Sequence, residues 1–236
     1  MNLNNMIRAM LFQPFSSHFE EWRKHIFNEF LHPLPADRIL DLGGGTGRRM
    51  AVLFPNKKEN IYIADISESD LAVARERYGY QTILLDESGK IPFDDKYFDI
   101  IFCNSVIEHV TVDKTQIYSI KTNTEFVEKS LVRQKKLSDE IRRAGRKYFV
   151  QTPYRHFLIE SHSWLPSFYI YFPRTTQIRF LKFTNKVWVK KTNPDFNLLN
   201  LRQMNNLFPE STIIREKLFF MTKSLIAVND DHEAVH

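Results

Sequence analysis

Cysteine is nearly absent from this sequence of 236 residues, and its scarcity excludes several classes of protein. The one cysteine, Cys103, lies in an apolar run, so we expect a buried thiol, with no intrachain disulfide and no cysteine-based metal cluster. Long apolar runs are missing too. No stretch approaches the ~18 apolar residues that span a bilayer, and the N-terminal segment lacks the apolar core of a signal peptide. These absences predict a cytoplasmic protein.

A strong excess of charge of either sign is also lacking. The formal net charge is +5, and 26% of the residues are charged against 43% hydrophobic, an ordinary globular balance. A mild positive charge is compatible with an anionic substrate, a nucleic acid or a membrane surface, and it requires none of them. The length suits one α/β domain with additional elements better than two full domains.

Glycine is scarce, but four of the seven glycines fall within five positions: Gly43, Gly44, Gly45 and Gly47. They directly follow a short apolar segment, Ile39–Leu42, which contains Asp41 and predicts a strand. Glycine permits a sharp turn with positive φ and the close approach of a ligand. A strand, a glycine turn and a helix build the nucleotide pocket of many α/β sheets.

The spacing of these glycines argues against a dinucleotide or a nucleoside triphosphate. In the dinucleotide fingerprint G-x-G-x-x-G, the third glycine would fall on Arg48 or Met50, depending on where the match begins. The Lys-Ser/Thr pair of a phosphate-binding P-loop does not follow the turn either. An NAD(P)-linked reductase is therefore a disfavoured alternative.

The turn resembles motif I of the class I S-adenosylmethionine (SAM) methyltransferases, an acidic residue followed by G-x-G-x-G. The matching residues are Asp41, Gly43, Gly45 and Gly47. The resemblance implies that these residues bind SAM, whose sulfonium and ammonium groups suit a nearby carboxylate. The methionine carboxylate of SAM can accept hydrogen bonds from backbone N–H groups of the turn.

Segments that predict strands alternate with helical patterns from Arg38 onward. This alternation indicates an α/β fold with a doubly wound, mostly parallel sheet and helices on both faces. The expected strands are 39–42, 60–66, 81–85, 98–104 and 147–152, and the expected helices are 47–54, 68–78, 124–144 and 198–207. The runs 211–220 and 222–228 predict an antiparallel hairpin, which resembles the end of the seven-stranded methyltransferase sheet.

Acidic and polar residues stand at the ends of these predicted strands, where a doubly wound sheet binds its ligand. Asp65 ends the second strand, Asp86 the third and Asn104 the fourth. In the resembled family, the first acid accepts both ribose hydroxyls, the second lies near the adenine amino group, and the polar residue faces the methionine half of SAM. The resemblance extends the cofactor-binding set to the neighbouring Ile66 and Glu87.

Two regions offer a general base that would remove a proton from the methyl acceptor. His109, next to Glu108, follows the fourth strand, and an imidazole has a suitable ordinary pKa. After the fifth strand, Glu160 and His162 stand two residues apart, so in an extended loop the carboxylate can orient the ring. A structural role in packing or in pinning a loop is the alternative for both regions. No metal-ligand spacing stands out, so we expect no metal site.

The patterns divide the chain into four parts: an N-terminal helical arm (1–36), a SAM-binding α/β core (37–153), an acceptor-side insertion or lid (154–196), and a C-terminal helix and hairpin that complete the sheet (197–236). Within the insertion, Trp164–Lys191 is rich in aromatic and basic residues. This composition predicts a lid over a large apolar acceptor, a membrane contact, a base-stacking surface or a packed helical subdomain, of which we favour the last.

The sequence therefore predicts a SAM-dependent methyltransferase that acts on a small-molecule or a glycan- or lipid-linked acceptor, with oxygen as the expected methylated atom. An RNA methyltransferase and a non-catalytic SAM-binding protein are the alternatives. Nucleic acid is the weaker partner because Asn104-Ser105-Val106-Ile107 stands where base amino-methylating enzymes carry a (D/N)PP(Y/F) signature. Peripheral contact with a membrane is compatible with the sequence.

Overall fold

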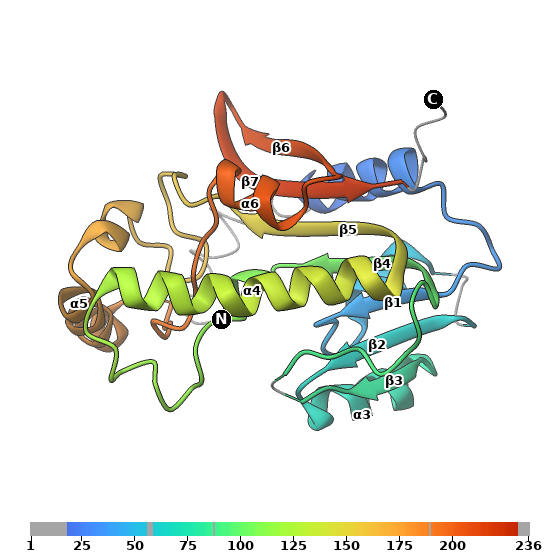
Figure 1. The fold of residues 1–236 in the computed structure, drawn as a ribbon, viewed down its shortest axis with the longest axis horizontal. Coiled ribbons are helices and arrows are strands. Elements are labelled where there is room, and N and C mark those ends of the chain that lie inside the picture. Colours follow the sequence, from blue (N-terminus) through green and yellow to red (C-terminus); the bar gives the residue numbers. More distant parts are fainter. Residues whose placement is uncertain (1–17, 56–58, 87, 189, 231–236) are drawn as a thin grey trace, which may run out of the picture.

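Seven strands form one sheet with helices on both of its faces (Figure 1). The computed structural model describes residues 18–55, 59–86, 88–188 and 190–230. The strands are β1 (Ile39–Leu42), β2 (Ile61–Asp65), β3 (Gln81–Leu84), β4 (Phe98–Asn104), β5 (Gly145–Pro153), β6 (Thr212–Leu218) and β7 (Met221–Asn229). Their order across the sheet is β3-β2-β1-β4-β5-β7-β6.

The direction in which the sheet grows reverses beside β1. Strands β2 and β3 extend the sheet on one side of β1, whereas β4 and β5 continue on the other, and all five are parallel. Strand β7 pairs antiparallel with β5, and β6 pairs antiparallel with β7. The predicted doubly wound sheet with a C-terminal hairpin is confirmed. A sheet of this type binds ligands at the carboxyl ends of the strands that flank the reversal, here β1 and β4.

Each face of the sheet is covered by its own helices (Figure 1). On one face pack α4 (Asn123–Ala144) and α6 (Leu201–Leu207), and on the other the helix of residues 18–31, α2 (Arg48–Leu53) and α3 (Glu68–Tyr78). Strand β1 serves both cores because successive side chains point to opposite faces. Leu40 and Leu42 join the α4 core, whereas Ile39 joins the other.

Local signals in the sequence set the helix ends. The Ser67 side chain accepts the Asp70 backbone N–H and begins α3, whose range matches the predicted helix 68–78, and Gly79 ends this helix with a φ of 73°. Helix α6 begins with a reciprocal capping box between Asn200 and Gln203. In the described ranges, no helix is both long enough and apolar enough to cross a membrane.

The insertion contains helix α5 (Arg174–Val187), which the helix ranges predicted from the sequence do not include. The buried face of α5 includes the polar residues Arg174, Gln177 and Thr184, whereas the apolar Phe183 is 63% exposed. Ile178 and Leu181 are buried on the same face, so an apolar pattern is present but is short and mixed with polar residues. A small apolar cluster fastens this region: Leu165, Tyr169, Ile170 and Leu181. The division of the chain into four parts stays a prediction, and residues 1–17 of the arm lie outside the described ranges.

The helix of residues 18–31 contributes to the main core through Phe27. This side chain is fully buried, and its ring centroid lies 5.6 Å from those of Phe54 and Phe102 and 6.0 Å from that of Phe149. Phe27→Ala should therefore lower the free energy of unfolding by about 3–5 kcal/mol in urea titrations. Phe220→Ala, at a position that is 86% exposed, is the control and should change it by less than about 0.5 kcal/mol. Equal effects would contradict the packing of this helix.

Candidate functional site

A glycine turn at the carboxyl end of β1 lies against the ends of β2 and β4. Gly43 has a φ of 71°, and a Cβ placed there would lie 2.4 Å from a methyl carbon of Val106, just after β4. The backbone N–H of Gly43 donates to the carbonyl of Ala64 at 2.7 Å. Gly45 and Gly47 also have positive φ, 54° and 72°. A side chain at position 43 would force these strand ends apart.

Asp65, the last residue of β2, fixes the middle of the turn. Its Oδ2 accepts the backbone N–H of Gly45 at 2.9 Å, and its Oδ1 accepts that of Ser67 at 3.0 Å. Each carboxylate oxygen has a further lone pair, so Asp65 can still accept hydrogen bonds from a ligand. The carboxylate thus orders the turn and borders the space beside it.

A cavity of about 300 Å³ opens beside Asp65 on the side of the sheet that α4 covers. This volume lies at the lower end of the ~300–1,000 Å³ typical of small-molecule sites. Hydrogen bonds from the hydroxyl and backbone N–H of Ser88 lower the pKa of the exposed Asp86 carboxyl at its rim. The wall includes five residues of the predicted site: Gly43, Asp65, Ile66, Asp86 and His109. We call this space the α4-side cavity.

A second cavity, of about 270 Å³, lies on the other side of the turn, and Gly43 borders both. Asp41 lines this α2-side cavity with only 3% of its surface exposed. Its Oδ2 has no hydrogen-bond partner among the described residues. Burial raises the pKa of Asp41 to about 7, although the nearby Arg49 guanidinium opposes the shift. A buried carboxylate without a partner is costly, so this wall favours a cationic ligand group.

Asn104 reaches the same α2-side cavity from the end of β4. Its Oδ1 lies 3.3 Å from Nη1 of Arg23, which donates to it from the helix of residues 18–31. Arg23 is held in place by two hydrogen bonds of 2.7 Å to the buried carboxylate of Glu216. Sequence patterns missed Arg23, because only the packing of this helix brings it to the cavity. Its fixed guanidinium can bind an anionic group.

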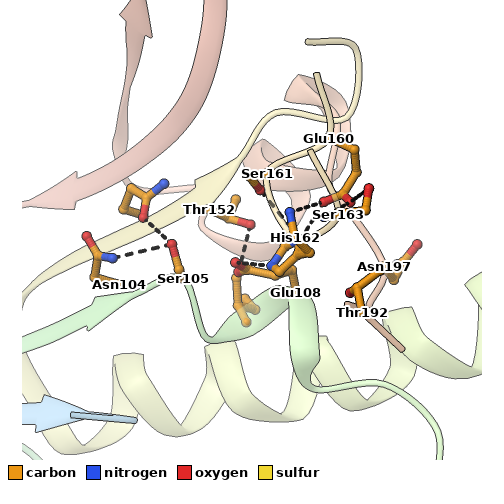
Figure 2. Close-up of polar contacts among 12 residues, drawn as sticks. Asn104, Ser105, Glu108, Thr152, Glu160, Ser161, His162, Ser163, Thr192 and Asn197 are labelled. Atoms are coloured by element: carbon orange, nitrogen blue, oxygen red, sulfur yellow. Dashed lines mark hydrogen bonds and ion pairs between the residues drawn. The ribbon is translucent and has the colours of Figure 1, made fainter. Parts of the chain in front are cut away.

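Beyond the α4-side cavity, two buried carboxylates enclose an imidazole (Figure 2). His162 Nδ1 lies 2.6 Å from Glu160 Oε1, and His162 Nε2 lies 3.5 Å from Glu108 Oε1. Glu108, in η1 (Ile107–His109), also accepts a hydrogen bond of 3.0 Å from the Thr152 hydroxyl. The ring of His109 meets that of His162 edge-on at 4.6 Å. The fold thus brings together all three predicted catalytic residues and adds Glu108.

The two imidazoles differ in charge. Burial lowers the pKa of His162, but hydrogen bonds and the negative charges of Glu108 and Glu160 outweigh it and raise the pKa to about 9. Burial raises the pKa of Glu160, but donors from His162 and Ser163 hold it at about 2. Burial lowers the pKa of His109, and the neighbouring His162 adds to this shift. At neutral pH, His162 therefore holds its proton and His109 does not, which argues against His162 as the base.

Known proteins match the first half of this sheet. Residues 40–122 match a family described as a methyltransferase domain. This match and the order of the strands support a class I SAM-dependent methyltransferase fold for residues 40–122. The ubiquinone/menaquinone biosynthesis C-methyltransferase of Vibrio vulnificus is 35% identical over 85 residues, which are 33% of this chain and 33% of that protein. The enzyme of the same name from Neisseria meningitidis is 31% identical over 84 residues. The chain spans about a third of the length of these curated relatives.

Solved structures extend the likeness of fold beyond the methyltransferase domain. A protein of Pyrococcus horikoshii OT3 aligns with a TM-score of 0.56 and 16% identity, covering 92% of this chain and 90% of its own. The geranyl diphosphate C-methyltransferase of Streptomyces coelicolor aligns with a TM-score of 0.54 and 12% identity, covering 90% and 80%. At these identities the likeness shows the fold alone.

The predicted cofactor residues fall into two groups, one on each side of the glycine turn. Asp65, Ile66 and Asp86 border the α4-side cavity, and Asp41 and Asn104 border the α2-side cavity. The turn that carries the predicted glycines lies between the two groups. Glu87 lies outside the described residues, so its predicted role stays a prediction. Sequence reasoning treated Glu108 only as the neighbour of His109, although it is fully buried and faces His162.

The unpaired carboxylate of Asp41 gives a prediction for pH dependence. The pKa of Asp41 is about 7 in the folded state, above its ordinary value of 3.8, so the folded state binds the proton more tightly. The free energy of unfolding therefore falls as the pH rises from 3.8 to about 7. Asp41→Asn should remove that loss. Urea unfolding on either side of the window should find the variant more stable than wild type only at the higher pH. Asp94→Asn, at an exposed acid, is the control and should leave the pH profile unchanged. A loss of stability with rising pH that persists in Asp41→Asn would contradict the assignment.

Proposed function

We propose that this chain transfers the methyl group of SAM to a small-molecule acceptor. The observation that carries the proposal is the buried Asp41 carboxylate, which has no hydrogen-bond partner among the described groups and lines a cavity at the glycine turn. SAM is a cationic nucleoside, with a sulfonium and an ammonium group that would neutralise this carboxylate. A pyrophosphate would instead bring negative charge towards it, which disfavours a dinucleotide.

The cofactor would cross the turn from one cavity to the other. Its ribose hydroxyls would donate to the free lone pairs of Asp65, and its adenine would extend towards Asp86 in the α4-side cavity. Its methionine end would lie near Asp41 and Asn104, where the fixed guanidinium of Arg23 would attract the carboxylate. Gly43 borders both cavities, so the cofactor would lie against the backbone of the glycine turn.

The acceptor would bind at the end of the α4-side cavity that His109 borders. Methyl transfer from a sulfonium is an in-line displacement, and good alignment alone contributes ~7–11 kcal/mol to lowering the barrier. His109 is better placed than His162 to contact the acceptor, because His162 is flanked by two carboxylates. Glu160 would act as a positioning residue that fixes the His162 ring.

An acceptor with an apolar portion suits the insertion. Side chains of this region that stay more than half exposed include Phe168 at 59%, Tyr171 at 54% and Phe183 at 63%. Together with nearby lysines and arginines, such side chains favour a lipid-linked or otherwise amphipathic acceptor. We propose oxygen as the methylated atom. The names of the relatives make carbon the second candidate, because those enzymes are C-methyltransferases.

Ligand-dependent stabilisation tests the cofactor. SAM at ~100 times its Kd should raise the free energy of unfolding by ~2.7 kcal/mol, measured as a thermal shift. Asp65→Asn should remove most of this shift because it weakens the contact with the ribose. Glu76→Gln, an exposed charge-neutralising change on α3, is the matched control and should keep the shift. Stabilisation by NADH without stabilisation by SAM would show that the proposal is wrong.

Turnover tests the acceptor side. Isotope-labelled SAM should yield a methylated product from a panel of small molecules that offer hydroxyl groups or carbon nucleophiles, and NMR of the labelled methyl group distinguishes oxygen from carbon. His109→Ala should lower kcat by about 10²-fold or more while leaving the SAM-dependent thermal shift intact. His25→Ala, on an exposed helix position, is the control. Turnover on RNA alone, or SAM binding without turnover on any acceptor, would overturn the small-molecule proposal.

A further inference from the structure

We propose that Glu108, His109 and His162 bind one divalent metal ion of the first transition row, such as Zn²⁺, beside the α4-side cavity. Each of the three side chains offers one ligand atom, and these atoms lie within 4.8 Å of one another. Glu108 and His109 come from η1 after β4, whereas His162 comes from the loop after β5. The ends of two adjacent parallel strands thus supply the three ligands.

The separation of two of these atoms matches a shared ion. His162 Nε2 and Glu108 Oε1 are 3.5 Å apart, which is longer than an ordinary N–H···O hydrogen bond. Two ligands bound to one tetrahedral zinc at ~2.0–2.1 Å lie about 3.3–3.4 Å from each other. The pair therefore needs almost no movement to hold an ion between them, and a rotation of His109 would bring in the third ligand.

The Glu108 carboxylate supplies an independent observation. Its side chain is fully buried, and Oε1 has no hydrogen-bond partner within the described part of the chain. The other oxygen, Oε2, is occupied by the Thr152 hydroxyl at 3.0 Å. In this structure Oε1 lies at ion-pair distance from His162 Nε2, and a bound metal ion would take the place of the His162 proton between these two atoms. The free oxygen points to the same space as His162 Nε2.

The surroundings orient the ligands in the manner of metal centres. Metal-binding histidines usually donate the N–H of their second nitrogen to a carboxylate, which fixes the ring. Here Glu160 Oε1 lies 2.6 Å from His162 Nδ1, and Glu160 is itself held by the Ser163 backbone N–H and hydroxyl. Phe196 stacks on the His162 ring at 4.7 Å. These contacts leave Nε2 as the nitrogen that faces Glu108.

The donor set selects the class of ion. Two imidazoles and one carboxylate suit Zn²⁺, Mn²⁺, Fe²⁺ or Co²⁺, whereas Mg²⁺ and Ca²⁺ prefer oxygen ligands. Because His109 borders the α4-side cavity and keeps part of its surface accessible there, an ion held here would keep an open position towards that cavity. Three protein ligands with one open position are typical of catalytic rather than structural zinc.

The role of the ion at this place rests on the proposed function. An acceptor hydroxyl bound at the open position would become more acidic, as water does on catalytic zinc. Its O–H bond would break and release the proton to solvent, and the O–CH₃ bond would form as the S–CH₃ bond breaks. The electron pair of that bond would stay on sulfur, giving neutral S-adenosylhomocysteine. An oxygen acceptor follows from this role, since carbon nucleophiles bind such an ion poorly.

Metal binding tests the site without any acceptor. The chain, stripped with a chelator and dialysed, should bind one Zn²⁺ or Co²⁺ by calorimetry and elemental analysis, and bound Co²⁺ should show the intense visible absorption of a tetrahedral site. Magnesium should not compete. Glu108→Gln and His162→Ala should abolish stoichiometric binding, and Glu160→Gln should weaken it roughly 10–100-fold. His156→Ala, a neighbouring exposed histidine that pairs with Tyr171, is the control and should bind normally.

Two results would overturn this proposal. One is a wild-type chain that takes up no ion, or whose Co²⁺ spectrum is the weak one of the aqueous ion, a readout that needs no variant to fold. The other is a Glu108→Gln variant, folded by circular dichroism, that binds as tightly as wild type. Tight binding by this variant would mean that other residues hold the ion and that Glu108 is no ligand. Thermal shifts with SAM are measured separately, so failure of the metal site and failure of the cofactor assignment are distinguishable.

Discussion

The close contact between Gly43 and Val106 determines where everything else in the site lies. A Cβ at position 43 would come within 2.4 Å of the Val106 side chain, so β1 and β4 can end this near to each other only with glycine at the turn. Val106 is followed directly by η1, which carries Glu108 and His109. The same contact therefore sets the distance between the glycine turn and the residues proposed to face the acceptor. A displacement of even an ångström there would misalign an in-line transfer.

Buried carboxylate oxygens without a hydrogen bond lie on both sides of the glycine turn. Asp41 on one side of the turn and Glu108 on the other each carry an oxygen that finds no hydrogen-bond partner among the described residues. By contrast, the buried carboxylate of Glu216 accepts two hydrogen bonds from Arg23. Both oxygens lie where the two proposals place a positive charge: the cofactor beside Asp41, and an ion in place of the His162 proton beside Glu108. The two carboxylates complement the positive charge of the donor molecule and of the proposed ion.

The sequence predicts those features that depend on neighbouring residues. The Ser67 cap fixes the start of α3, and the alternating strands fix the parallel sheet and its C-terminal hairpin. Glu160 and His162 meet as predicted, but through a turn rather than an extended loop: the Trp164 backbone N–H donates to the Glu160 carbonyl, and that of His162 donates to the Glu160 carboxylate. Arg23 and Glu108 escape prediction because their contacts join distant segments. Nothing in the sequence near Arg23 indicates that its helix packs against β4 and β6.

Helix α5 shows a second limit of prediction from the sequence. Its buried face holds Arg174, whose guanidinium lies 3.7 Å from the centre of the Phe126 ring and donates to the backbone carbonyls of Ile117 and Pro194. These partners belong to other segments, so a polar residue becomes part of a core that its own neighbours do not reveal. Apolar periodicity fails wherever a buried charge is satisfied by distant backbone groups.

Polar contacts join the insertion to the row formed by Glu108, His162 and Glu160. The Glu160 carboxylate accepts hydrogen bonds from Ser163 and from the Tyr169 hydroxyl, and Tyr169 belongs to the apolar cluster that holds α5. On the opposite side, the backbone N–H of Asn197 donates to the Glu108 carbonyl at 2.8 Å. Both ends of the insertion thus support the row of Glu108, His162 and Glu160. Because the exposed Phe183 of α5 takes no part in these contacts, substitutions at this position leave the row of Glu108, His162 and Glu160 in place.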